Sequence, residues 1–96
     1  MSAMREMPRY KCHKEVWALK IAKILPAAGG LAAHENEETD GGLIIYPVEE
    51  GYAPFRVEPE YVHKHNPQAG GYYVVYKGGY ASFSPAEAFE EGYTRA

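Results

Sequence analysis

The alternation of apolar and polar residues is clearest near the end of the chain, where it predicts a β-hairpin over about 71–84. Tyr72–Lys77 is aromatic and β-branched, as strands prefer, and Gly78-Gly79 can supply the positive φ angles of a two-residue turn. Side chains alternate between the faces of a strand. With this turn, the predicted buried face carries Tyr72, Val74, Tyr76, Ala81 and Phe83, and the wetter face carries Tyr73, Val75, Lys77, Tyr80, Ser82 and Ser84.

A short capped helix is predicted to follow the hairpin over about 85–91. In Ser84-Pro85-Ala86-Glu87 the serine caps the free N–H groups, the proline takes the first helical position and the glutamate completes a capping box. Gly92 is a natural stop. Because Phe89 and Tyr93 are four residues apart, one helical face can pack on the sheet.

The first part of the chain divides into a flexible lead-in, residues 1–9, and the start of a single domain, residues 10–96. Tyr10–Leu25 fits two patterns, because its apolar residues alternate as in a strand and also recur at helical spacing. We favour a strand that extends to about Ile21, is apolar on both faces and is therefore central. Pro26–Gly30 is expected to end it.

The middle of the chain predicts short elements separated by turns. Leu31–Asp40 is acidic and is expected to form a mobile loop or a short frayed helix. Further elements are a strand over Leu43–Tyr46 ended by Pro47, a short strand over Phe55–Val57, and one or two helical turns over Glu58–His65 with Pro59 first and Pro67 after them. The predicted class is α+β with a small antiparallel sheet.

Composition narrows the classes of function. A chain of 96 residues predicts one domain with a modest core. Because oligomerisation commonly stabilises so small a domain, we expect a homo-oligomer. The net charge of −3 without a basic stripe argues against nucleic-acid binding. The single cysteine, Cys12, suits a reducing compartment. With neither a signal peptide nor a membrane-length apolar run, we expect a soluble cytoplasmic protein that binds no membrane.

Candidate catalytic and metal sites are weak. Cys12 and His13 would point to opposite faces of a strand, and His63 and His65 diverge on a helix, so neither pair is suited to one metal ion. The sequence contains none of the nucleophile-elbow, phosphate-loop, metalloprotease or dinucleotide motifs. We therefore expect no catalysis, no metal and no cofactor.

Both ends of the chain resemble a family of small phage and prophage proteins sometimes named for a PGDYG motif. Lys14–Ile21 resembles the family's first strand. The C-terminal motif is matched by Gly70, Tyr72, Val74, Gly79, Phe89 and Tyr93. Ala69 replaces the motif proline and Gly71 its aspartate, and the resemblance covers less than half of the chain.

The resemblance implies a compact layout of strands with a terminal hairpin. That layout is similar to the layout of small phage proteins that sequester cyclic nucleotide signals of bacterial immunity. A similar fold does not by itself establish a shared function. The expected function is non-catalytic: sequestering a small nucleotide-type immune signal, a cyclic nucleotide or an ADP-ribose-type molecule, in the bacterial host cell. Two alternatives stay open, a protein-binding inhibitor of a host enzyme and a minor virion or assembly component.

A nucleotide ligand needs flat apolar surfaces for its base and cations for its phosphates. Nine tyrosines are many for this length, and tyrosine is favoured at ligand sites. The predicted ligand-binding residues are Tyr73 and Tyr80 for stacking, and Lys77, Arg56 and Lys64 for phosphates. Arg56 is the strongest candidate because a guanidinium binds phosphate bidentately; the alternative is a surface ion pair with Glu58 or Glu60.

Overall fold

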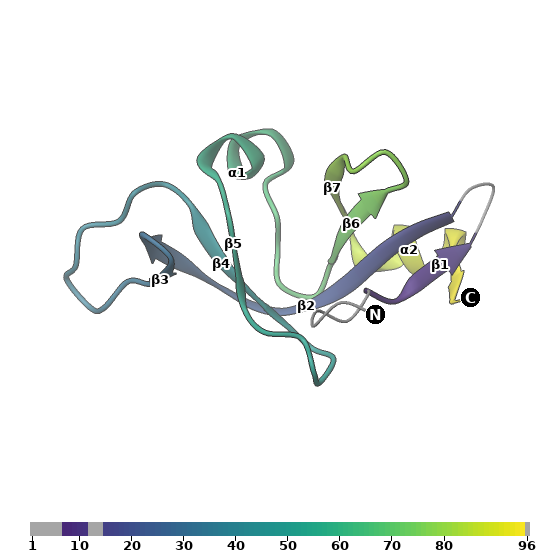
Figure 1. Ribbon diagram of the computed structural model, residues 1–96, viewed down its shortest axis with the longest axis horizontal. Helices are drawn as coiled ribbons and strands as arrows, with labels where there is room; N and C mark the ends of the chain where they lie inside the picture. The colour runs from purple at the N-terminus through teal and green to yellow at the C-terminus, as the bar shows by residue number, and fades with distance from the viewer. Residues whose placement is uncertain (1–6, 12–14, 96) are drawn as a thin grey trace.

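The computed structural model describes residues 7–11 and 15–95 and shows a small mixed fold with more sheet than helix (Figure 1). The strands are β1 (Arg9–Lys11), β2 (Glu15–Ala28), β3 (Leu31–Ala32), β4 (Leu43–Pro47), β5 (Phe55–Val57), β6 (Tyr72–Tyr76), β7 (Ala81–Ser84) and β8 (Thr94–Arg95). The helices are α1 (Pro59–His65) and α2 (Ala86–Gly92). The strand pairs in this part of the chain are antiparallel, which is compatible with the predicted α+β class.

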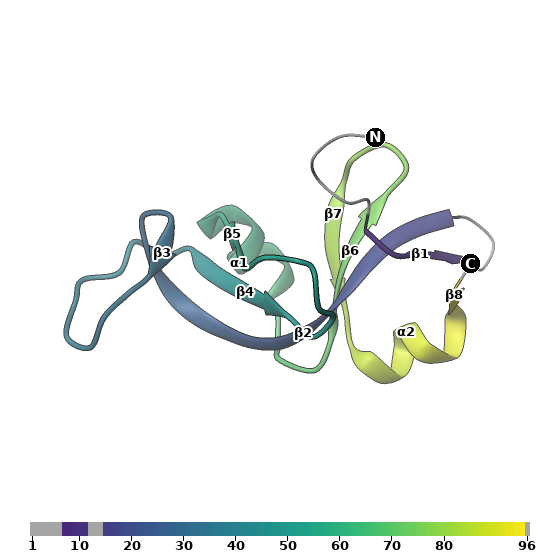
Figure 2. The ribbon, with the colours of Figure 1, turned by 60° about the horizontal axis from the view of Figure 1, so that its bottom comes forward.

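Strand β2 organises the sheet. Its first half pairs with β1 and β6, and its second half pairs with β4 and β3. The remaining strands extend these pairs, since β8 adds to β1, β7 to β6 and β5 to β4. Figures 1 and 2 show β2 running through both halves of the molecule. The predicted central strand, apolar on both faces, is confirmed as β2, but its predicted start at Tyr10 is wrong, because Tyr10 lies in β1 and pairs with Val16 of β2.

The predicted end of this strand at Pro26 is wrong, because β2 continues to Ala28. The Pro26 carbonyl accepts a hydrogen bond from the Ala33 N–H at 2.9 Å, and the Ala27 N–H donates to the Gly42 carbonyl at 3.1 Å. Successive residues of a strand bond to opposite neighbours, so Pro26 faces the short strand β3. The N–H group that proline lacks would have pointed toward the end of this two-residue strand. Its absence therefore removes no hydrogen bond between β2 and β4.

Two apolar clusters lie on opposite faces of the sheet. The first contains Val16, Ala18, Tyr72, Val74 and Phe89. The second contains Ile21, Ile45 and Val57, with Phe55, Tyr61, Val62, Tyr73 and Phe83 packed against them. Helix α2 therefore covers one face and α1 the other, each with the side chains that alternation along β2 and β6 directs toward it.

The hairpin differs from the prediction by one residue in register. Its loop has three residues, Lys77 to Gly79, because the Tyr76 N–H donates to the Tyr80 carbonyl at 2.9 Å and the Gly79 N–H to the Tyr76 carbonyl at 2.8 Å. Val74 consequently lies opposite Ser82, whereas a two-residue turn would have placed it opposite Phe83.

A one-residue slip moves every side chain of one strand to the other face, and the predicted faces of β7 are therefore wrong. Phe83 lies opposite Tyr73, on the α1 side of the sheet, and is only half-buried. Ser82 is buried at 9% exposure on the α2 side. The predicted burial of Tyr72 and Val74 is confirmed.

Helix α2 begins one residue later than predicted and without the predicted cap. Pro85 occupies the N-cap position, no side chain caps the helix, and Ser84 belongs to β7. The helix is held on the sheet by Phe89, which is 1% exposed and stacks on Tyr72 at 4.2 Å between ring centroids. The Tyr72 hydroxyl also donates to Glu90 at 2.8 Å.

The three short elements predicted in the middle of the chain are confirmed as β4, β5 and α1. Of the predicted lead-in, residues 1–6 lie outside the described part of the chain. Pro8 is buried, its carbonyl accepts the Ala18 N–H at 2.9 Å, and Arg9 begins β1. Cys12 and His13 also lie outside the described residues.

Candidate functional site

Two of the predicted ligand-binding residues, Lys64 and Tyr80, meet where the end of α1 approaches the hairpin loop. The Lys64 ammonium lies 5.1 Å from the centroid of the Tyr80 ring. His65 Nε2 is 3.2 Å from the Tyr80 hydroxyl, and the Tyr76 ring lies nearly parallel to that of Tyr80, 6.0 Å away. We name Lys64, His65, Tyr76 and Tyr80 the Tyr80 platform. Tyr80 is 49% exposed, so much of its surface is available to a ligand.

Local sequence explains how α1 presents its part of the platform. Proline at the first helical position starts the helix, and Asn66 ends it in a left-handed conformation with φ 46°. Lys64 and His65 therefore lie in the last turn. The Tyr61 hydroxyl donates to the Ser82 carbonyl at 2.7 Å and joins α1 to β7.

Tyr73, predicted as a second stacking residue, is part of the core beneath α1. Its ring lies 4.7 Å from that of Phe55 and 5.6 Å from that of Tyr61. Burial raises the pKa of its hydroxyl. The predicted common face for Tyr73 and Tyr80 is wrong because of the hairpin register, and Tyr73 supports α1 rather than the platform.

Arg56 is engaged in ion pairs away from the platform. Its Nη1 donates to the Gly29 carbonyl at 2.6 Å and to Asp40 at 2.9 Å, and its Nε donates to Glu58 at 3.0 Å. Glu58 first, and then Asp40, raise the pKa of the guanidinium. The alternative given for Arg56, a surface ion pair with Glu58, is therefore confirmed.

Asp40 is a structural residue that the sequence reasoning missed. Its carboxylate accepts the backbone N–H groups of Gly29 at 2.8 Å and Gly42 at 3.0 Å, besides pairing with Arg56. These hydrogen bonds, the one from Gly42 first, lower the pKa of Asp40 to about 2. The acidic segment, expected to be a mobile loop or a short frayed helix, instead begins as strand β3 and ends where Asp40 holds the Gly29 and Gly42 backbone.

The platform has the chemistry of a binding surface. Burial, and then the charge of Lys64, lower the pKa of His65, which favours the neutral form of its ring. The platform therefore offers an aromatic surface, one ammonium and neutral polar groups, with Lys77 exposed in the adjacent loop. Within residues 7–11 and 15–95, no group of three His, Cys, Asp or Glu side chains is placed to hold a metal ion.

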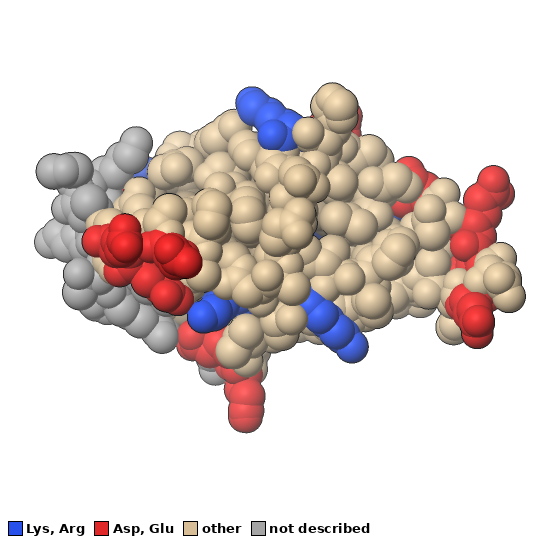
Figure 3. Space-filling view, turned by 180° about the vertical axis from the view of Figure 1, so that it is seen from behind, with Lys and Arg blue, Asp and Glu red and all other residues tan. Residues whose placement is uncertain are grey.

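His65 and Tyr76 were not predicted as platform residues. A signal for His65 existed, since it follows Lys64 in the last helical turn, but its contact with Tyr80 depends on how α1 packs on the hairpin. Figure 3 shows acidic side chains gathered toward the two ends of the face opposite to that of Figure 1, and the basic side chains of the described residues on this face are scattered.

Comparison of the chain with protein-family models, curated proteins and solved structures finds no match. In the described part of the chain, no helix is long and apolar enough to cross a membrane.

Proposed function

We propose that this protein is a non-catalytic binder of a small nucleotide-type ligand, which it holds on the Tyr80 platform. The observation that carries the proposal is the half-exposed Tyr80 ring with the Lys64 ammonium 5.1 Å from its centroid. A nucleobase stacks on an aromatic side chain, and a lysine on a flexible stem can turn from the ring to a phosphate. Lys77, in the hairpin loop that precedes Tyr80, supplies a second cation.

Because Arg56 is paired with Asp40 and Glu58, the cations of the proposed site are lysines only. Lysine ammonium groups bind phosphate as point charges, without the bidentate geometry of a guanidinium. Because Lys64 and Lys77 are exposed, their attraction to phosphate is screened by salt. We expect binding to weaken steeply between low and physiological ionic strength.

The resemblance to phage proteins extends the proposal to a biological role. A protein that holds a cyclic nucleotide or an ADP-ribose-type signal without altering it would lower the free concentration of that signal in a bacterial host cell. Heating should release the ligand unchanged. Native mass spectrometry of protein purified from bacteria would read the retained ligand and the predicted homo-oligomer together, and light scattering at low micromolar concentration would check the latter.

Calorimetry against a panel of cyclic dinucleotides and ADP-ribose tests the binding. Tyr80→Ala should weaken binding by about 5- to 150-fold, the range of one base–aromatic stack. Lys64→Gln should weaken binding and reduce its salt dependence. Lys23→Gln is the matched control, because it removes the same charge from a lysine that also lies over a tyrosine ring, that of Tyr46 at 4.7 Å.

The proposal fails if no member of the panel binds and the purified protein retains no small molecule. A second candidate is inhibition of a host protein, which the edge strand β7 favours because it pairs only with β6 among the described strands and can accept an added strand. One specific partner captured from a bacterial lysate, and lost with Tyr80→Ala, would favour this candidate. Presence in purified virions would instead favour a particle component.

A further inference from the structure

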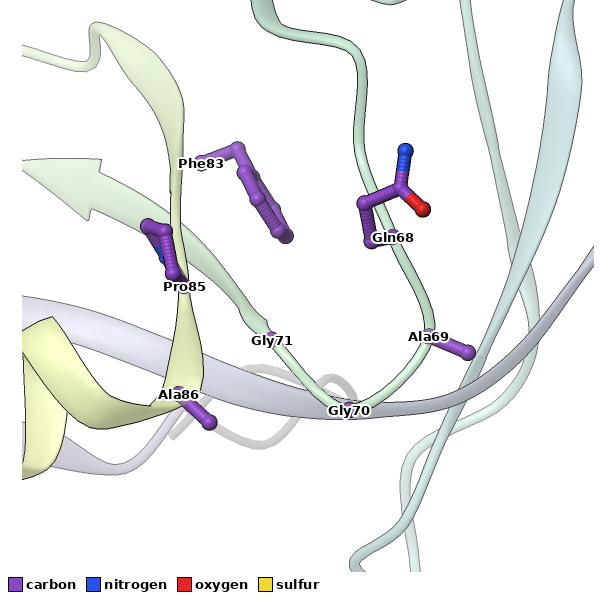
Figure 4. A pocket seen from close by; sticks show the side chains of 7 residues that line it. All are labelled: Gln68, Ala69, Gly70, Gly71, Phe83, Pro85 and Ala86. Carbon is purple, nitrogen blue, oxygen red and sulfur yellow. The ribbon is translucent and has the colours of Figure 1, made fainter.

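A hollow of about 260 Å³ lies between the Gln68–Gly71 turn and the connection from β7 to α2 (Figure 4). Figure 4 shows the Phe83 ring and the Gln68 side chain on opposite sides, with the backbone of Gly70 and Gly71 between them. Pro85 and Ala86 complete the wall beside Phe83, and the methyl group of Ala69 points away from the hollow.

Hydrogen bonds to β2 hold the floor of the hollow in place. The Gly70 N–H donates to the Ile21 carbonyl at 2.8 Å, and the Ile21 N–H donates to the Gly71 carbonyl at 2.8 Å. A Cβ atom at Gly71 would lie 2.4 Å from two ring carbons of Phe83. The Phe83 ring therefore rests against the glycine backbone, and the wall exists before any ligand arrives, which reduces the entropic cost of binding.

The lining combines apolar walls with one amide. Phe83, Pro85 and Ala86 supply the apolar surface, and none of the described residues that line the hollow is charged. The Gln68 side chain offers both donors and an acceptor, and its nitrogen makes only a long contact, 3.4 Å, to the Asn66 carbonyl. The volume is just below the roughly 300–1,000 Å³ of ordinary ligand pockets, which suits a single ring system.

We propose that this hollow binds an uncharged, flat heteroaromatic ring with a neighbouring hydrogen-bond donor and acceptor, the chemistry of a nucleobase. The ring lies against Phe83 and its polar edge meets the Gln68 amide. A purely aliphatic occupant would displace water from that amide without replacing its hydrogen bonds. A phosphate would meet no cation there. The site is separate from the Tyr80 platform and does not depend on a ligand at that platform.

Titration of the ¹⁵N-labelled protein with adenosine and guanosine, at high salt, tests this proposal. Both nucleosides are uncharged, so salt should not weaken their binding. We expect chemical-shift changes at the Gln68 side-chain amide and at the Gly70 and Gly71 N–H groups. Gln68→Leu should weaken binding at least about fivefold, the worth of one neutral hydrogen bond. His63→Leu is the control and should bind normally, because His63 is exposed on α1 and does not line the hollow.

Toluene, titrated in parallel, separates ring recognition from general apolar contact. The Gln68→Leu variant should bind toluene at least as well as the unchanged protein does. Since Gln68 is exposed, this substitution leaves the fold intact. Gly71→Ala, which pushes on Phe83, should lose the binding of both probes.

Three results would overturn the proposal: no shifts around the hollow with either nucleoside, equal nucleoside affinity in Gln68→Leu, or toluene binding as tightly as the nucleosides. Nucleoside shifts confined to Tyr80 and its neighbours would also overturn it while leaving the platform proposal standing. Conversely, adenosine shifts at Gln68 without any nucleotide binding at Tyr80 would support the hollow and remove the platform.

Discussion

Gly79→Ala should destabilise the protein relative to Gly78→Ala, because only Gly79 of this pair has a positive φ angle, 94°. A Cβ atom added at either glycine meets no atom within 4 Å. Side-chain crowding is therefore absent at both positions. The two glycines differ only in backbone conformation.

The expected difference follows from the conformation alone. A left-handed backbone costs an L-residue with a Cβ about 1–2 kcal/mol. The reduced entropy of the unfolded chain, which favours alanine over glycine, is common to both variants and cancels in their difference. Gly79→Ala should therefore be about 1–2 kcal/mol less stable than Gly78→Ala, which is a separation in Tm of roughly 4–16 °C for a domain of this size.

Urea and thermal unfolding, followed by circular dichroism, measure this difference. Gly79→Asn is the matched control, because asparagine tolerates positive φ better than alanine, and it should recover part of the loss. A two-residue hairpin turn requires positive φ at both central residues if it is type I′, and at the first, here Gly78, if it is type II′. Equal losses at the two glycines, or a larger loss at Gly78, would refute the three-residue loop and with it the faces assigned to Phe83 and Tyr80.

The remaining predictions concern the core and the response to acid. Phe89→Ala should lower the free energy of unfolding by about 3–5 kcal/mol and reduce the helical circular-dichroism signal, because α2 has no side-chain cap and Phe89 is its one buried residue. Phe89→Leu should lower it by less than about 1.5 kcal/mol. Equal losses of stability in the two variants would refute the packing of Phe89 on the sheet. The pKa of Asp40 is lowered from 3.8 to about 2, first by Gly42, so its stabilising effect is complete above pH 4 and is lost as pH falls to about 2. The stability gap between the unchanged protein and Asp40→Asn, measured by urea unfolding, should shrink over that range, and a constant gap would contradict this role of the ionised carboxylate.

The candidate site shows which of its residues a sequence can reveal. Tyr80 is predicted as a stacking residue from its place on the wetter face of the hairpin, and Lys64 as a phosphate contact from its charge, but the sequence does not predict that the two meet. Their contact with His65 requires α1 to lie against the hairpin, and that packing depends on the bond from Tyr61 to Ser82. The role of Arg56 was open between phosphate and ion pair, since its main acidic partner besides Glu58 is 16 residues away in the chain.

Local sequence was sufficient for elements whose ends carry their own signals. Pro59 starts α1, Pro47 ends β4, and the β-branched and aromatic run over Tyr72–Tyr76 forms β6, because proline geometry and strand propensity act within a few residues. The paired glycines likewise predicted a turn between β6 and β7.

Contacts between distant segments decided the length of that turn, the end of β2 and the start of α2. Gly78-Gly79 is compatible with either a two-residue or a three-residue loop, and the choice between them sets the face of every side chain of β7, Phe83 included. Phe83 fits on the α1 side because Gly71 has no side chain beneath its ring, and the α2 side is filled by Phe89. The burial of these rings depends on how distant segments pack together. The residues of the hairpin alone therefore do not determine its register.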